Sequence, residues 1–198
     1  MAKTRRKLQA ESPLGGFETR HNDTHLSEIQ QLSLVSLAPF TGAMDRFHRA
    51  SKTLFDKKLP DPRMALIGEN RFLMPSAHNQ WFLGFTDKDD DAVSAAKALL
   101  GAATTKVVAM TDQSDAWAAL SLSGSRARIV LEHLCQLDCR DTAMPQGATA
   151  RTIMAHLGVI LLRQRDTDEG TPCFWMFTPR SSAQSFLDSV MAVPPFTR

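Results

Sequence analysis

Residues 144–152, with the sequence MPQGATART, bring a turn and a charged side chain close together. Gly147 permits a left-handed turn, and Pro145 fixes the backbone that enters it. The planar guanidinium of Arg151 can bind a carboxylate through paired hydrogen bonds, or it can stabilise a loop or a subunit contact. Thr152 continues the segment as a strand by β-branched packing. Because no nucleophile, base or metal cluster lies beside them, we predict a structural or interfacial role, with ligand binding as the alternative.

The glycine-rich loops that hold nucleotide phosphates are absent from the sequence. LIGENRF and LSGSRAR each contain one glycine, without the G-x-G-x-x-G or G-x4-G-K-[ST] spacing that such loops need. There is also no G-x-S-x-G motif, which places a nucleophilic serine on a sharp turn. We therefore expect no catalytic and no cofactor-binding residue on this chain.

The histidines and aspartates do not predict a metal site. His21 and His25 are four residues apart but have no third ligand nearby, which favours a surface pair. His156 lies in an apolar stretch, where a hydrogen-bonded core or interface histidine is expected. The run of carboxylates at 89–91 precedes a predicted helix, where such residues cap the helix and complement its dipole.

Composition and cysteine usage indicate the compartment and exclude two classes of partner. Cys135, Cys139 and Cys173 are an odd number without a matching histidine pair, which favours reduced, buried thiols in a cytoplasmic protein. No hydrophobic segment follows the basic start MAKTRRKLQA, so a secretory signal is not expected. The net charge of +2 argues against nucleic acid as a partner. No apolar run approaches the roughly 20 residues that span a membrane.

Hydrophobic periodicity predicts the same order of elements in each half of the chain, namely a strand, a helix, further strands and a helix. The segment 150–164 is expected to form two strands, or one strand bent at Gly158. A stripe of Ile129, Val130, Leu134 and Leu137 is expected to face the core from the helix at 125–137. The predicted strands are 32–40, 64–68, 71–75, 81–85, 115–124, 150–164 and 172–179, and the predicted helices are 41–55, 87–101, 125–137 and 181–193.

The repeated order indicates an α+β fold of two pseudo-repeated halves, with antiparallel sheets covered by helices. We expect a single domain over 31–198, with pseudo-repeats at about 31–104 and 105–193. Residues 1–30 lack helical or strand periodicity, and we predict that they form an extended arm laid on a neighbouring subunit.

Five short motifs connect the second half to a known family. TDQSD, LSGSRAR, CQLD, PQGATART and PRSSAQS occur in this order at 111–115, 122–128, 135–138, 145–152 and 179–185. In order and spacing they resemble the gamma subunit of bacterial heterotetrameric sarcosine oxidase. The early segment ESPLGG also resembles an S-P-L segment near the start of that family. The resemblance covers most of 105–193, whereas 30–104 match only in the order of elements.

The resemblance implies a fold similar to the folate-binding domain of the glycine-cleavage T-protein. It further implies a place in an alpha–beta–gamma–delta enzyme that demethylates sarcosine with oxygen. The products are glycine, hydrogen peroxide and, with tetrahydrofolate, 5,10-methylenetetrahydrofolate. FAD, FMN, NAD and tetrahydrofolate are then expected on the other subunits, and the alpha, beta and delta subunits are the expected partners.

On this interpretation the chain is a small, non-catalytic structural subunit. Gly147, Arg151, Thr152 and Arg180, which lie in the motifs PQGATART and PRSSAQS, are then interface or structural residues. One alternative is a stand-alone tetrahydrofolate-binding protein with a pocket between its pseudo-repeats. Another is the gamma subunit of a related N-methyl amino acid demethylase.

Overall fold

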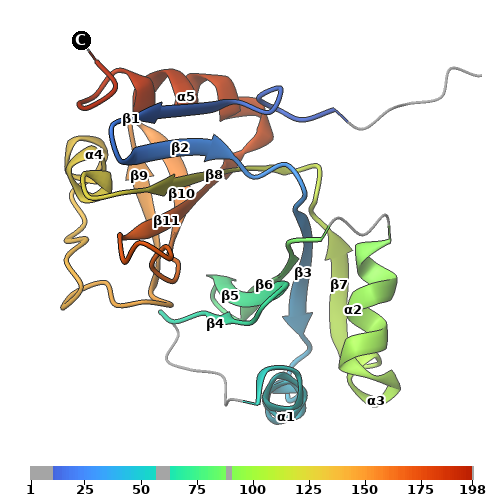
Figure 1. The fold of residues 1–198 in the computed structure, drawn as a ribbon. Coiled ribbons are helices and arrows are strands. Elements are labelled where there is room, and N and C mark those ends of the chain that lie inside the picture. Colours follow the sequence, from blue (N-terminus) through green and yellow to red (C-terminus); the bar gives the residue numbers. More distant parts are fainter. Residues whose placement is uncertain (1–10, 57–62, 88–90, 198) are drawn as a thin grey trace, which may run out of the picture.

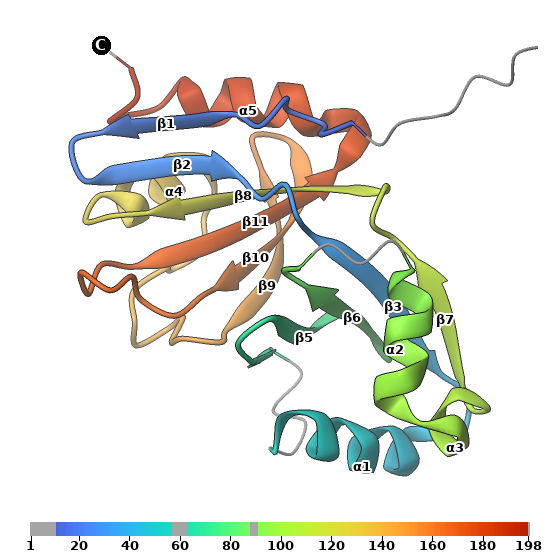
Figure 2. The same cartoon turned by 45° about the vertical axis from the view of Figure 1, so that its right-hand side comes forward.

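The computed structural model describes residues 11–56, 63–87 and 91–197. Within these ranges the chain forms two antiparallel sheets, with helices packed on their outer faces (Figure 1, Figure 2). The inner faces meet in a core of aromatic and aliphatic side chains. This arrangement confirms the α+β class with antiparallel sheets that the sequence predicts. Asp89, Asp90 and the basic start of the chain lie outside the described residues.

The first sheet has six strands in the order β1-β2-β8-β11-β10-β9. Helices α4 (Ala127–Leu134) and α5 (Ala183–Met191) cover its outer face, where they bury Val130, Leu131 and Phe186. The turn η1 (Arg180–Ser182) leads from β11 into α5. The strands are β1 (Glu18–His21), β2 (Thr24–Glu28), β8 (Trp117–Ser123), β9 (Thr149–Met154), β10 (Leu157–Arg163) and β11 (Cys173–Pro179).

The second sheet has five strands in the order β4-β5-β6-β3-β7 and carries α1 (Met44–Phe55), α2 (Ala92–Leu100) and α3 (Ala102–Thr105). The Asp91 carboxylate accepts a hydrogen bond of 2.9 Å from the Ser94 N–H and caps α2, as predicted. Gly101 follows the helix with a φ of 75°. The strands are β3 (Ser33–Pro39), β4 (Leu66–Ile67), β5 (Arg71–Ala77), β6 (Gln80–Phe85) and β7 (Val108–Asp112).

The two sheets share one strand order. In each sheet, four strands that are consecutive along the chain lie side by side in the order first, fourth, third, second: β3-β6-β5-β4 in one sheet and β8-β11-β10-β9 in the other. Each sheet also receives a strand from the other half of the chain. β2 directly precedes β3 but pairs with β8, and β7 directly precedes β8 but pairs with β3. This exchange ties the two halves together, while their origin in a duplication stays a prediction.

Residues 11–30 do not form the extended arm that the sequence analysis predicts. They contain the β1–β2 hairpin, and β2 lies between β1 and β8 within the sheet. Thr24, Leu26 and Glu28 of β2 are buried, so the strand does alternate. The alternation escapes a search for apolar residues because two of its three inward side chains are polar. The Glu28 carboxylate is satisfied by the Ser12 hydroxyl and by the N–H groups of residues 14 and 16, at 3.1 and 2.7 Å.

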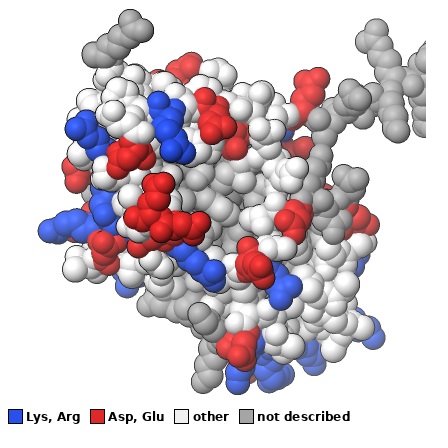
Figure 3. Space-filling view, viewed as in Figure 1, with Lys and Arg blue, Asp and Glu red and all other residues white. Residues whose placement is uncertain are grey.

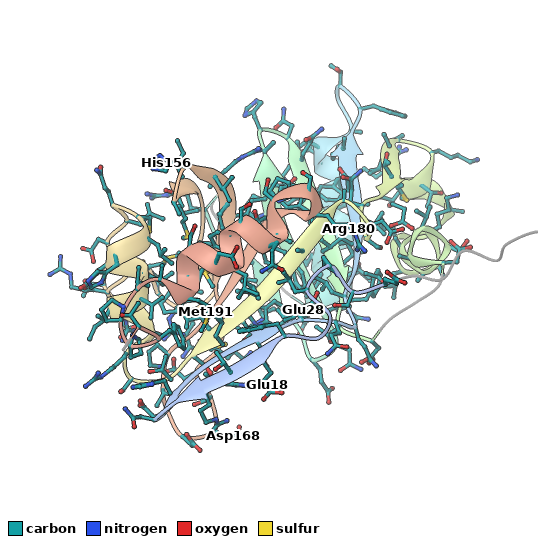
Figure 4. All side chains as sticks on the ribbon, turned by 90° about the horizontal axis from the view of Figure 1, so that it is seen from above. Glu18, Glu28, His156, Asp168, Arg180 and Met191 are labelled. Atoms are coloured by element: carbon teal, nitrogen blue, oxygen red, sulfur yellow. The ribbon has the colours of Figure 1, made fainter. Side chains whose placement is uncertain are left out.

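The segment 150–164 forms two strands, but its turn lies at Ala155 and His156 and not at Gly158. These two residues have φ values of 47° and 69°, as a two-residue turn between twisted strands requires. His156 is therefore exposed at the tip of a hairpin, and the prediction of a core position within a strand is wrong, while an interface position stays a prediction. In the view of Figure 4, His156 lies across α5 from Glu28.

Two further details differ from the sequence analysis. β7 was not predicted, since its residues beyond Val108 are mostly exposed and it gives no apolar pattern. On α4, Ile129 is 41% exposed, and Leu131 takes the core position in its place. The buried set is Ala127, Val130, Leu131 and Leu134, which has the spacing of one helical face.

Two glycines in strands differ in the space around them, so an added methyl group should change the free energy of unfolding in opposite directions. A Cβ on Gly84 in β6 would lie 2.1 Å from Phe72 Cζ, because the Phe72 ring covers its cross-strand partner Gly84. We expect Gly84→Ala to lower the free energy of unfolding by about 1–3 kcal/mol through overpacking. Gly158→Ala meets open space in β10 and should raise it by up to about 1 kcal/mol. Urea unfolding of both variants measures the difference, and equal effects would contradict this packing.

Candidate functional site

Gly147 is buried inside the molecule. Its N–H donates to the Arg163 carbonyl at 2.8 Å, and its carbonyl accepts from the Ala65 N–H at 2.7 Å. The turn thereby joins β10 to the segment that leads into β4 of the other sheet. Its φ is 88°, and a Cβ would lie 3.2 Å from the Ala65 carbonyl oxygen. A left-handed backbone and a close approach together explain why a glycine stands here.

Arg151 and Thr152 lie on β9, the edge strand of the six-stranded sheet. Arg151 is exposed, and its guanidinium reaches the Ser76 carbonyl of β5 only at 3.5 Å. Thr152 is half-buried on the opposite face of the strand, and Ile153 is 68% exposed. In the part of the chain that the structure describes, the only ladder contact on the outer side of this strand is the Met64–Ala148 bridge near its start. We call residues 150–156 the β9 edge. It presents a cation and a large apolar side chain, and at its far end the Ala155 N–H donates to the Leu134 carbonyl at 3.2 Å.

A small cavity lies beside Arg151 at the junction of the two sheets. Its volume is about 350 Å³, near the lower end for ligand pockets. Arg151 is the one charged residue of its described lining, which otherwise combines hydroxyls, amides and apolar groups. The main polar and aromatic contributors are Ser36, Ser76, Gln80, Thr111, Gln113 and Trp117. The geometry therefore keeps the binding of a small carboxylate as an alternative role for Arg151.

Arg180 belongs to a different part of the fold. Its backbone N–H donates to the Ala116 carbonyl at 2.9 Å, and its guanidinium binds the carbonyl of Glu11. Figure 4 shows Arg180 beside the first turn of α5. Arg180 thus anchors the start of the described chain to the end of β11. The four residues singled out by sequence do not form one site, since Gly147, Arg151 and Thr152 share a segment and Arg180 stands apart.

An ionic cluster around the buried Arg163 was missed by the sequence analysis. The Arg163 side chain is 2% exposed, lies 5.1 Å over the Phe174 ring and donates to the Cys173 carbonyl at 3.2 Å. Asp166 pairs with it, and Asp141 links it to Arg128. The hydrogen bond from Arg163 lowers the pKa of the Asp166 carboxyl below its usual range. Arg163 ends the apolar run GVILLR, so only its alternation with Val159 and Leu161 signals that it points inward.

The three cysteines are free thiols in different surroundings. Cys139 and Cys173 are buried, whereas Cys135 is half-buried. The Cys139 thiol lowers the pKa of Cys135 to about 7. The pKa of Cys139 is raised by Cys135 and by burial. Burial raises the pKa of Cys173, whose thiol lies 3.7 Å from the Ser121 hydroxyl.

Among the described residues, the other histidines and carboxylates do not gather into a metal site. His25 lies 2.8 Å from the Glu18 carboxylate on the β1–β2 hairpin, and His21 is exposed. Across 11–56, 63–87 and 91–197, no three His, Cys, Asp or Glu side chains gather where a metal ion would fit. No helix in these ranges combines the length and apolar character needed to cross a membrane. Positive and negative side chains intermix on the face in Figure 3, so that face has no field of a single sign.

The fold has clear counterparts among solved structures, although no protein-family model matches the sequence. The search of curated proteins gives no match either. A chain of the heterotetrameric sarcosine oxidase from Corynebacterium sp. U-96, in complex with pyrrole 2-carboxylate, superposes with a TM-score of 0.69. The two chains are 15% identical, and the match covers 88% of this chain and 85% of that one.

The second counterpart is the glycine cleavage system aminomethyltransferase T from Bartonella henselae, with a TM-score of 0.57 and 14% identity. The match covers 86% of this chain but 46% of that one, so this chain spans about half the length of the aminomethyltransferase. This chain has a T-protein-like fold. Identities this low establish the fold alone, and the fold agrees with the one that the sequence resemblance implies.

Replacing Gly147 or Arg151 by alanine should change the free energy of unfolding by different amounts, although the two residues are only four positions apart. Gly147→Ala forces a side chain into a left-handed backbone and against Ala65, so we expect a loss of about 1–3 kcal/mol in unfolding free energy. Arg151→Ala removes only an exposed contact and should change it by less than about 0.5 kcal/mol. Denaturant unfolding of the full-length variants tests both values. A large loss with Arg151→Ala would mean that its side chain supports the fold.

Proposed function

We propose that this chain is a small, non-catalytic structural subunit of a complex related to heterotetrameric sarcosine oxidase. The complex would oxidatively demethylate sarcosine to glycine with oxygen, giving hydrogen peroxide and 5,10-methylenetetrahydrofolate. The observation that carries the proposal is the superposition with a sarcosine oxidase chain over most of both chains, at a TM-score of 0.69. The five ordered motifs in 111–185 support the gamma subunit as the specific counterpart.

The proposal places the redox chemistry on other chains. FAD, FMN, NAD and tetrahydrofolate would be held by the alpha, beta and delta subunits in the cytoplasm. The lack of glycine-rich phosphate loops in the sequence supports this division, because such loops are what usually hold dinucleotides. This chain would then contribute surface and rigidity to the assembly.

The β9 edge is the surface that we propose for subunit contact. An edge strand offers unpaired backbone groups to a partner chain, and natural proteins usually protect such edges. Here the edge carries Ile153 at 68% exposure beside Arg151. An apolar anchor next to an arginine is a combination enriched at protein–protein contacts.

The alternative with structural support is a stand-alone tetrahydrofolate-binding protein. The cavity beside Arg151 offers one cation to a carboxylate and several amides and hydroxyls to polar ring atoms. Its volume of about 350 Å³ is small for a ligand of that size, which favours the subunit proposal. A gamma subunit of another N-methyl amino acid demethylase would have the same fold, and the chain itself does not select the substrate.

Copurification from the native cell tests the subunit proposal. A tagged full-length chain should bring down partner chains in fixed stoichiometry, with a flavin absorbance spectrum. Oxygen uptake with sarcosine and with other N-methyl amino acids then identifies the substrate. Recovery of the chain alone, without flavin, would count against the subunit role. Calorimetry of the isolated chain with tetrahydrofolate addresses the alternative, which micromolar binding would favour.

Substitutions at the β9 edge should affect assembly more than chemistry. We expect Arg151→Ala and Ile153→Asp to lower the yield of assembled complex about tenfold, since an anchor contact contributes about 1–2 kcal/mol. Complex that still forms should turn over at a near-normal rate per flavin. Ile129→Asp is a matched control, because Ile129 is also an exposed isoleucine but belongs to α4 and not to β9.

Size-exclusion chromatography measures assembly, and oxygen uptake per flavin measures turnover in the complex that forms. An intact complex in which Arg151→Ala abolishes demethylation would contradict the interfacial role and would indicate that the segment reaches an active site. Equal effects of Ile153→Asp and Ile129→Asp would contradict the choice of edge.

A further inference from the structure

A hollow lies between α1 and the turn that leads from α2 into α3. α1 packs against both of these helices, and Phe47 of α1 shares a buried cluster with Leu100 of α2 (Figure 2). Beside this cluster the surface is hollowed by about 380 Å³, which is enough for a small ligand. The residues of the lining that matter here are Arg46, Arg49, Leu99, Gly101 and Thr104.

Two arginines of α1 face this hollow. Arg46 and Arg49 are exposed and stand three positions apart on the helix, so their side chains leave the same face and can reach one anion. Within 11–56, 63–87 and 91–197, neither arginine forms an ion pair with a carboxylate. The described lining contains no carboxylate, although Asp45 precedes Arg46 on the same helix. Two like charges this close repel each other, and a bound anion would remove that repulsion.

Thr104 gives a second, independent indication of a ligand. The residue is 5% exposed and belongs to the lining of the hollow. Its N–H donates to the Gly101 carbonyl at 3.1 Å, and its carbonyl accepts from the Val107 N–H at 3.0 Å. Its hydroxyl, by contrast, has no hydrogen-bond partner among the described residues. Because buried hydroxyls are normally hydrogen-bonded, we expect an acceptor from outside the chain.

The number and type of these donors favour a phosphate group over a carboxylate. A phosphate monoester offers three terminal oxygens and a charge of nearly −2 at neutral pH, which matches two guanidinium groups and one hydroxyl. A carboxylate has two oxygens and one charge. Gly101 leaves the approach open, since a Cβ at this position would meet nothing within 4 Å.

We propose that this hollow binds a phosphate group, with Arg46 and Arg49 neutralising its charge and the Thr104 hydroxyl donating to one of its oxygens. The same donors recognise free phosphate and the phosphate of a small organic ester. For an ester, Leu99 provides apolar surface to the organic part. The hollow belongs to the helices of the five-stranded sheet and not to the β9 edge, so the inference does not rest on the proposed subunit role.

Titration calorimetry at low ionic strength tests the site, with the full-length chain and any subunits that copurify with it. The probes are inorganic phosphate and phenyl phosphate, and acetate is the carboxylate for comparison. We expect saturable phosphate binding with a dissociation constant on the order of 1 mM, weakened several-fold by added sodium chloride because the arginines are exposed. Tighter binding of phenyl phosphate would identify an organic phosphate as the ligand, and equal binding would identify free phosphate.

Variants connect the binding to the hollow. We expect Arg46→Gln combined with Arg49→Gln to weaken phosphate binding about tenfold or more, since charge-assisted hydrogen bonds are lost. The matched control is Arg20→Gln combined with Arg126→Gln, which removes the same charge from exposed arginines outside the hollow and should leave the affinity nearly unchanged. Thr104→Val should weaken binding about fivefold while the circular dichroism spectrum stays the same, because its hydroxyl has no described partner to lose.

Three results would overturn the proposal. One is the absence of saturable binding of either phosphate well above the expected dissociation constant. Another is an equal loss of affinity in the hollow variants and in the arginine control. The third is tighter binding of acetate, or of a polyaspartate peptide, than of both phosphates, which would assign the hollow to an acidic protein segment. The unaltered chain and Thr104→Val each test the site, so a double variant that fails to fold does not remove the test.

Discussion

β2 pairs with β8, in the other half of the chain, and not with β3, the strand that directly follows it. β7 makes the reciprocal connection to β3. Because each sheet is completed by a strand from the other half, neither sheet can separate without breaking backbone hydrogen bonds. The inner faces of the two sheets also pack against each other, with the ring centroids of Phe72 and Phe177 5.9 Å apart. The chain-end hairpin is therefore part of the core structure, and β9 is left as an outer edge.

Some elements of the fold can be predicted from the sequence and others cannot. α2 was predictable because Asp91 and Gly101 have the types and places of helix ends. β2 was not, because Glu28 points inward and depends on hydrogen bonds from residues 12–16 that only the folded chain supplies. The turn at Ala155 and His156 carries only a weak local signal, since histidine is enriched at positive φ but alanine is not. Such features depend on tertiary contacts and not on local preference.

The candidate site divides in the same way. The sequence predicts a turn at Gly147 and a strand through Thr152, and both are present. The sequence does not show that Gly147 is buried against Ala65, whereas the Arg151 side chain is exposed at the edge of the sheet. The hydrogen bond from Arg128 to the Cys139 carbonyl likewise joins α4 to a loop whose place the sequence does not reveal. Spacing along the chain identifies residues, and the fold decides which of them reach one another.

We propose that this chain is a scaffold and that its partners carry the demethylation chemistry. The most direct test is sarcosine-dependent oxygen uptake per flavin by the partner subunits, produced with and without this chain. We expect full assembly and turnover with the chain, and loss of stable assembly with a matching fall in uptake without it. Partner subunits that assemble and turn over fully without the chain would contradict it, as would demethylation by the isolated chain.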